Sequence, residues 1–220
     1  MRNAIKMLDY QEVRLTFFCM FYNMKGENKM QSELQEVQRY GRNKNTIVNH
    51  SYINRGEYRK KFDSISNDKA LNRKVYQIAK KMLEHRSGTL FEDMYWLDID
   101  SLDIVAAETE QRTENRIKYS KATKKAIAQS DNLLVIHTHP NSMPPSINDF
   151  NSALKNKYRL CIVCCHDGKI FMYHSKKHVV DFLNKGTIAK YRKMGYDDFN
   201  SQIFALKELQ SHGDIFFKEV

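Results

Sequence analysis

Two histidines separated by a single residue form the first candidate site in this sequence. His137 and His139 end the apolar run that begins at Leu133. Side chains alternate along a strand, so both imidazoles should point to one side while Thr138 points to the other. Imidazoles placed in this way can share one metal ion, although hydrogen bonds alone also satisfy many such pairs. The pair therefore indicates a candidate metal site that needs a third ligand.

A carboxylate shortly downstream could supply that ligand. Ser146 and Asp149 form a Ser-x-x-Asp pattern at the start of a predicted helix, which is typical of a capping box. A carboxylate in the first helical turn could also face the two histidines. Two histidines, one carboxylate and a water are the open arrangement of catalytic zinc, whereas structural sites usually have four protein ligands and favour cysteine. We therefore expect Zn²⁺ bound by His137, His139 and Asp149.

The segment between the histidines and the helix contains every proline of the chain: Pro140, Pro144 and Pro145. Proline fixes its own φ angle and stiffens a turn. We expect this turn to hold the third ligand in place.

The elements around the candidate site follow from hydrophobic periodicity. One helical face runs through 71–86 and ends before Gly88. The apolar and turn patterns predict strands at 90–99, 103–107, 133–137, 160–165 and 169–173. They predict further helices at 121–129, 146–156, 176–194 and 197–211, with a polar loop at 108–120. This order predicts an α/β (α+β) fold in which helices flank a mixed sheet.

The chain divides by composition into two parts. Residues 1–69 are polar and charged, and they are expected to form an N-terminal helical extension (helices at 4–23 and 30–40) and an Asn-rich linker. Residues 70–220 are expected to form the domain that carries the site.

The net charge of +10 has two interpretations. The basic residues are scattered in short groups, which favours solvated helix faces over the clustered patch that nucleic-acid binding requires. Nucleic acid stays the weaker alternative. With 41% hydrophobic residues, including 12 Phe and 12 Tyr, the chain can bury a core, which excludes a fully disordered class.

Membrane and secretory signals are weak. The apolar stretch Leu15–Tyr22 is too short to span a bilayer and is a poor signal peptide, so we expect a cytoplasmic protein without membrane contact. Cys161, Cys164 and Cys165 share an apolar run and are expected in a buried strand; a metal site with His166 is the weaker interpretation.

Glu92, the run His137-Thr138-His139-Pro140, Ser146 and Asp149 together resemble the JAMM (JAB1/MPN/Mov34) metalloprotease motif. The likeness covers about residues 71 to 175. It implies a mixed sheet flanked by helices and a zinc-dependent peptidase or isopeptidase that hydrolyses an amide bond.

The resemblance also implies a role for each residue. His137, His139 and Asp149 would hold zinc, Ser146 would stabilise the oxyanion, and Glu92 would be the general acid/base. Six residues separate His139 from Ser146. The commonest spacing in the family is seven residues. Element order favours Glu92 over the other candidate carboxyls, which are Glu84, Glu108 and Glu110.

Two stretches, 86–95 and 140–146, look more specifically like JAB-type domains of bacterial mobile elements, some of them attached to phage minor-head proteins. This likeness implies a protein or peptide substrate, such as a ubiquitin-like tail or a phage protein. The loop at 108–120 would guide it. The alternative function is a non-catalytic interaction module in phage head or complex assembly.

Overall fold

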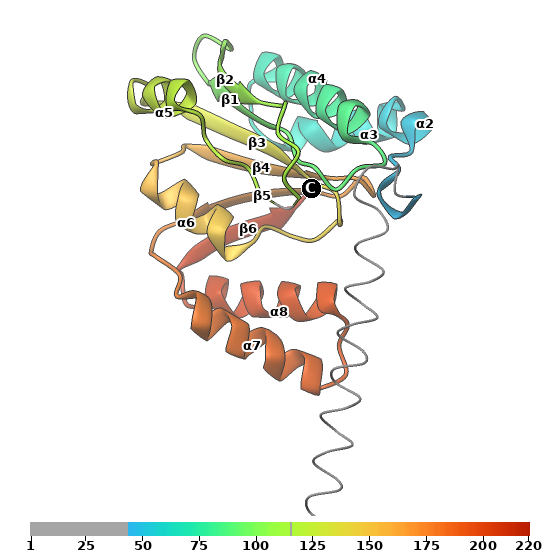
Figure 1. Ribbon diagram of the computed structural model, residues 1–220, viewed down its shortest axis with the longest axis vertical. Coiled ribbons are helices and arrows are strands. Elements are labelled where there is room, and N and C mark those ends of the chain that lie inside the picture. Colours follow the sequence, from blue (N-terminus) through green and yellow to red (C-terminus); the bar gives the residue numbers. More distant parts are fainter. Residues whose placement is uncertain (1–43, 115) are drawn as a thin grey trace, which may run out of the picture. The chain divides into compact units, whose positions relative to one another are not determined.

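The computed structural model describes residues 44–114 and 116–220 (Figure 1). The helices expected at 4–23 and 30–40 lie outside these residues, as does Cys19. The compact unit that contains the candidate site extends from Arg42 to Val220.

A mixed sheet forms the centre of this unit. Its strands lie in the order β2-β1-β3-β4-β5-β6, and β3 and β4 are parallel while the other neighbours are antiparallel. The strands are β1 (Met94–Asp98), β2 (Ile104–Glu108), β3 (Leu133–His139), β4 (Leu160–Cys165), β5 (Ile170–Ser175) and β6 (Ile215–Glu219). The predicted α/β class, a mixed sheet flanked by helices, is confirmed.

Helices cover both faces of the sheet (Figure 1). On one side lie η1 (Lys44–Thr46), α2 (His50–Ile53), α3 (Gly56–Lys61), η2 (Phe62–Ser64) and α4 (Lys69–Arg86). The others are α5 (Lys121–Ala128), α6 (Ile147–Lys155), α7 (Asp181–Lys193) and α8 (Asp198–Ser211). None of these described helices combines the length and apolar character needed to cross a bilayer.

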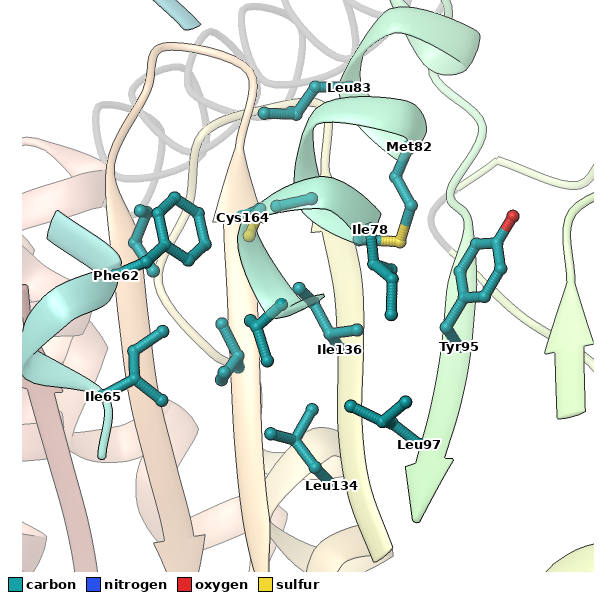
Figure 2. Close-up of a cluster of buried hydrophobic side chains, with 14 of the residues drawn as sticks. Phe62, Ile65, Ile78, Met82, Leu83, Tyr95, Leu97, Leu134, Ile136 and Cys164 are labelled. Atoms are coloured by element: carbon teal, nitrogen blue, oxygen red, sulfur yellow. The ribbon is translucent and has the colours of Figure 1, made fainter. Parts of the chain in front are cut away.

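The side-chain alternation of β3 determines what lies on each face. Leu134 and Ile136 belong to the core on the α4 side, and Figure 2 shows Ile136 next to Ile78 of α4. Leu133 and Val135 belong to the opposite core, together with α6 residues. Since the period is two residues, His137 and His139 continue the second row and face the α6 side.

The residues just upstream of α4 belong to the core and do not form a free linker. Val48, Ile53, Tyr58 and Phe62 are almost fully buried and pack in the α4-side core. The compact unit therefore reaches upstream of the boundary near residue 70 that composition suggests. Elements of three to six residues are too short to show the periodicity on which that boundary rests.

Two strand assignments differ from the sequence pattern. β1 begins at Met94, so Leu90–Asp93 is an irregular segment ahead of the strand, in which Phe91 forms an isolated bridge with Glu114. β6 is absent from the predicted elements, and it pairs with β5 through Phe217 at the edge of the sheet. The parallel pair β3 and β4 places the carboxyl end of β3, with its histidines, inside the sheet.

Candidate metal centre

His137, His139 and Asp149 bring their ligand atoms together. The two Nε2 atoms are 3.1 Å apart. His137 Nε2 lies 3.4 Å from Asp149 Oδ1, and His139 Nε2 lies 3.5 Å from Asp149 Oδ2. All three ligand atoms lie within 4.8 Å of one another, which is close enough for one ion. Within the described ranges, this is the group of at least three such side chains that could hold a metal.

A backbone carbonyl sets the orientation of one imidazole. His139 Nδ1 lies 2.8 Å from the Met143 carbonyl oxygen, which can only accept, so Nδ1 carries the proton and donates it. The Nε2 atom is thereby turned toward the other ligands, as in metal sites where the second ring nitrogen binds an outer carbonyl. His137 Nδ1 is buried and has no hydrogen-bond partner among the described residues.

The charges of the cluster are strongly coupled. Burial lowers the pKa of His139, but the hydrogen bond and charge of Asp149, helped by Glu92, raise it to about 9. Burial acts to raise the pKa of Asp149, yet the two histidines hold that pKa well below its usual range. Asp149 is therefore a carboxylate at neutral pH, which is the form that binds metal.

Asp149 is both a member of the capping box and the candidate third ligand. The Asp149 carboxylate accepts a hydrogen bond from the Ser146 backbone N–H at 2.6 Å through Oδ2, and Ser146 Oγ accepts one from the Asp149 N–H at 3.3 Å. The two interpretations of Ser-x-x-Asp are thus compatible. The cap of α6 fixes the rotamer of Asp149 with its carboxylate against the histidines.

The short turn between the ligands is held from a distant helix. Pro140, Pro144 and Pro145 are all buried. Gln202, on α8, donates hydrogen bonds at 3.1 Å to the carbonyls of Pro144 and Pro145. The turn is therefore fixed by its own prolines and by the C-terminal part of the chain.

Glu92 lies beside the metal ligands without joining them. It occupies the irregular segment before β1, is half-buried, and lines the same cleft as His137, His139 and Asp149. Burial raises its pKa, while the charge of the two histidines opposes that rise. A carboxyl group of this kind is suited to take up a proton.

The rival carboxyls are engaged elsewhere. Glu84 pairs with Lys80 on α4. Glu108 accepts hydrogen bonds from the Ser120 N–H and the Thr123 hydroxyl, and Glu110 contacts Thr109. Of the four candidates, Glu92 alone lines the cleft.

The sequence pattern does not indicate the hydrogen bonds that hold Asp93, the residue directly after Glu92. Asp93 is 1% exposed, and its carboxylate accepts hydrogen bonds from Arg86 Nε at 2.5 Å and from His85 Nδ1 at 2.8 Å. Its backbone N–H donates to Thr138 Oγ1 at 3.0 Å. A charged residue next to a strand is usually exposed, so the sequence pattern does not predict the buried Arg86–Asp93 pair.

The expected core role of the cysteines is confirmed. Cys161, Cys164 and Cys165 are free and completely buried, and burial raises the pKa of each thiol. They belong to the cores on the two faces of the sheet and do not form a metal group with His166.

The cleft over the metal ligands has a volume of about 1550 Å³. It is lined by residues 116–119 and Lys124, by residues of α6, and by residues of α7 and α8. An open cleft leaves room for a water and a substrate beside the ligands.

Comparisons with protein-family models, curated proteins and solved structures found no match for this chain. Its function must therefore be inferred from the geometry of the described residues and from the motif resemblance.

Proposed function

We propose that this protein is a zinc-dependent peptidase or isopeptidase of the JAMM type, which hydrolyses an amide bond in a protein or peptide. One observation carries the proposal. His137, His139 and Asp149 converge at the base of an open cleft, and a carboxyl group outside that set, Glu92, lines the same space.

The residues present fit zinc. Two imidazole nitrogens and one carboxylate oxygen are the donor types that three-ligand catalytic zinc sites use. The Met143 carbonyl holds His139 in the tautomer that leaves Nε2 available. The cluster also keeps Asp149 in the charged form that binds metal, since the two histidines hold its pKa well below its usual range.

The chemistry would divide between the ion and the chain. Bound zinc supplies Lewis acidity, which lowers the pKa of water to about 7 and polarises a carbonyl. Glu92 accepts the proton from the attacking water and later returns it to the leaving amine. The Ser146 hydroxyl accepts from the Asp149 N–H, so its own hydrogen is free to stabilise the developing oxyanion.

A cytoplasmic setting is part of the proposal, because the cysteines of the described residues are free thiols rather than disulfides.

Metal content is the first test. Purified protein, stripped with chelator and reloaded, should bind one equivalent of zinc, and His139→Ala should not. Peptidase activity on a degenerate peptide library should follow the zinc content. Protein that binds no zinc and cleaves no peptide after zinc addition would refute the proposal and favour the non-catalytic interaction module.

A further inference from the structure

The cleft is lined by many residues besides the candidate metal ligands, and several of them are basic. The segment after β2 supplies Arg116 and Lys118, α5 supplies Lys124, and the last turn of α6 supplies Lys155. All four side chains are exposed. None of them forms an ion pair with another described residue.

Acidic residues do not balance these charges. Three carboxyl groups line the cleft among the described residues, and two of them, Glu92 and Asp149, belong to the metal centre. The third, Asp198, lies 2.7 Å from Arg192, which also lines the cleft, so these two neutralise each other. Of the five Lys and Arg residues in the lining, four are therefore left as uncompensated positive charges facing the substrate space.

The wall that carries two of these charges is held in place. Gln111 and Lys118 are joined by two hydrogen bonds, one of them from the Lys118 N–H to Gln111 Oε1 at 2.7 Å. The ring of Tyr119 packs edge-on against Trp96, with 4.9 Å between ring centres. The basic groups are therefore presented by a folded segment beside β1.

Between the basic walls, the cleft offers the contacts that an extended peptide uses. Met94, Ile117 and Leu154 provide apolar surface, and the exposed amide of Asn148 on α6 lines the same cleft. The amide of Asn151 is already bonded to the Val179 backbone. Side-chain amides can both donate to and accept from a peptide backbone.

We infer that the substrate is an acidic peptide segment, bound in the cleft with its Asp or Glu side chains against Arg116, Lys118, Lys124 and Lys155. This inference rests on the proposed amide hydrolysis and adds the substrate class to it. The charge complementarity selects the partner, since opposite charges across an interface favour the right partner and penalise a basic one.

An acidic peptide fits this cleft better than nucleic acid does. Single-stranded nucleic acid is bound by aromatic rings on which bases stack. Among the described lining residues, Tyr119 supplies the Phe, Tyr or Trp ring, and it is already packed against Trp96. The basic groups also converge on a centre whose proposed chemistry acts on amides.

Binding can be measured separately from cleavage. The probe is a fluorescein-labelled peptide with a run of Glu residues, compared with the same peptide in which Gln replaces every Glu, on zinc-loaded full-length protein carrying Glu92→Gln. The test variant adds Arg116→Glu and Lys124→Glu. The matched control adds Lys60→Glu and Arg73→Glu, which change the net charge equally on exposed residues of α3 and α4, outside the cleft lining.

The Glu peptide should bind at least about tenfold more tightly than the Gln peptide, and the difference should shrink between about 50 and 300 mM salt. The test variant should remove this preference and the control should keep it. Equal binding of both peptides, equal loss in both variants, or displacement of the Glu peptide by a lower concentration of single-stranded DNA would overturn the inference.

Cleavage by the wild-type chain then separates the two proposals. A Glu-peptide preference that depends on Arg116 and Lys124, without cleavage of any library peptide, would refute the hydrolase and leave the acidic-ligand cleft standing. Cleavage that does not depend on acidic residues near the scissile bond would support the hydrolase and refute the acidic-peptide inference.

Discussion

Thr138 and Asp93 exchange two hydrogen bonds. The Asp93 N–H donates to Thr138 Oγ1 at 3.0 Å, and the Thr138 N–H donates to the Asp93 carbonyl at 3.1 Å. Thr138 lies between the two histidine ligands, and Asp93 directly follows Glu92. The pair therefore ties the proposed proton acceptor to the strand that carries the two candidate histidine ligands, from the face opposite the candidate metal site.

Thr138→Val should disturb this tie while keeping side-chain volume. It leaves the buried Asp93 N–H without its acceptor, which costs about 1–3 kcal/mol. We expect kcat to fall while zinc content stays near one equivalent, as measured by metal analysis and peptide cleavage on the same preparation. Thr138→Ser keeps the hydroxyl and should behave like the wild type. An unchanged kcat in Thr138→Val would show that the tie does not position Glu92.

Glu92→Gln should keep the zinc and lose turnover. The amide has nearly the same shape but cannot accept the proton, so the rate should fall by about 10²–10⁴. Single-turnover cleavage and metal analysis check both parts. Full activity in this variant would remove Glu92 from the mechanism. Glu84→Gln, on the exposed side of α4, serves as the control and should cleave normally.

Asp149→Asn should separate metal binding from helix capping. The Asn carbonyl can still accept from the Ser146 N–H, but the ligand charge is lost. We expect zinc affinity to fall by more than about 100-fold, beyond what loss of an outer-sphere partner causes, in competition titrations with a chelator. The metal-free variant should also be less stable at neutral pH, because Asn keeps the cap but removes the charge that pairs with the histidines. Retained zinc affinity would exclude Asp149 as a ligand.

Asp93→Asn should destabilise the fold through Arg86. The guanidinium is buried, and it would lose its carboxylate partner, a change that costs about 3–5 kcal/mol in buried pairs. Urea unfolding measures the effect. Asp214→Asn breaks the exposed pair with Lys177 and should cost less than about 1 kcal/mol. Equal effects of the two substitutions would mean that the Arg86–Asp93 pair contributes no more than a surface contact.

Gly168→Ala and Gly186→Ala should have opposite effects. Gly168 has φ +89° in the β4–β5 turn, and an added Cβ would lie 2.5 Å from Tyr52 Cε1, so alanine should destabilise by more than about 1 kcal/mol. Gly186 lies within α7 with open space around it, so alanine should stabilise by about 0.5–1 kcal/mol. Thermal unfolding of both variants checks the contrast, and stabilisation by Gly168→Ala would contradict it.

Much of the site can be predicted because its signals are local. The two-residue period of β3 puts His137 and His139 on one face, and the cap signal of α6 locates Asp149. The helices predicted at 71–86, 121–129, 146–156 and 197–211 lie close to their observed bounds for the same reason, whereas the helix predicted at 176–194 begins only at Asp181. Element order is also enough to select Glu92, among four carboxyls, as the one that lines the cleft.

The rest depends on contacts that local patterns do not encode. β6 forms because β5 offers an unpaired edge, and Val48 and Ile53 are buried because α4 and the sheet leave a space for them. Asp93 is buried because Arg86 and Thr138 happen to meet it there. Such contacts join residues that are far apart in the sequence and form only once the sheet is assembled. Local hydrophobic periodicity therefore does not predict them.

The turn between the ligands has consequences for any minimal fragment of this protein. The motif resemblance ends near residue 175, yet Gln202 holds the carbonyls of Pro144 and Pro145. At the other end, the Thr46 carbonyl accepts from His166 Nδ1 at 2.6 Å, and the His166 N–H donates to the His139 carbonyl at 3.3 Å. A fragment cut to the motif would keep every ligand and lose both of these outer supports. The shortest fragment that preserves the centre must therefore include both Thr46 and Gln202.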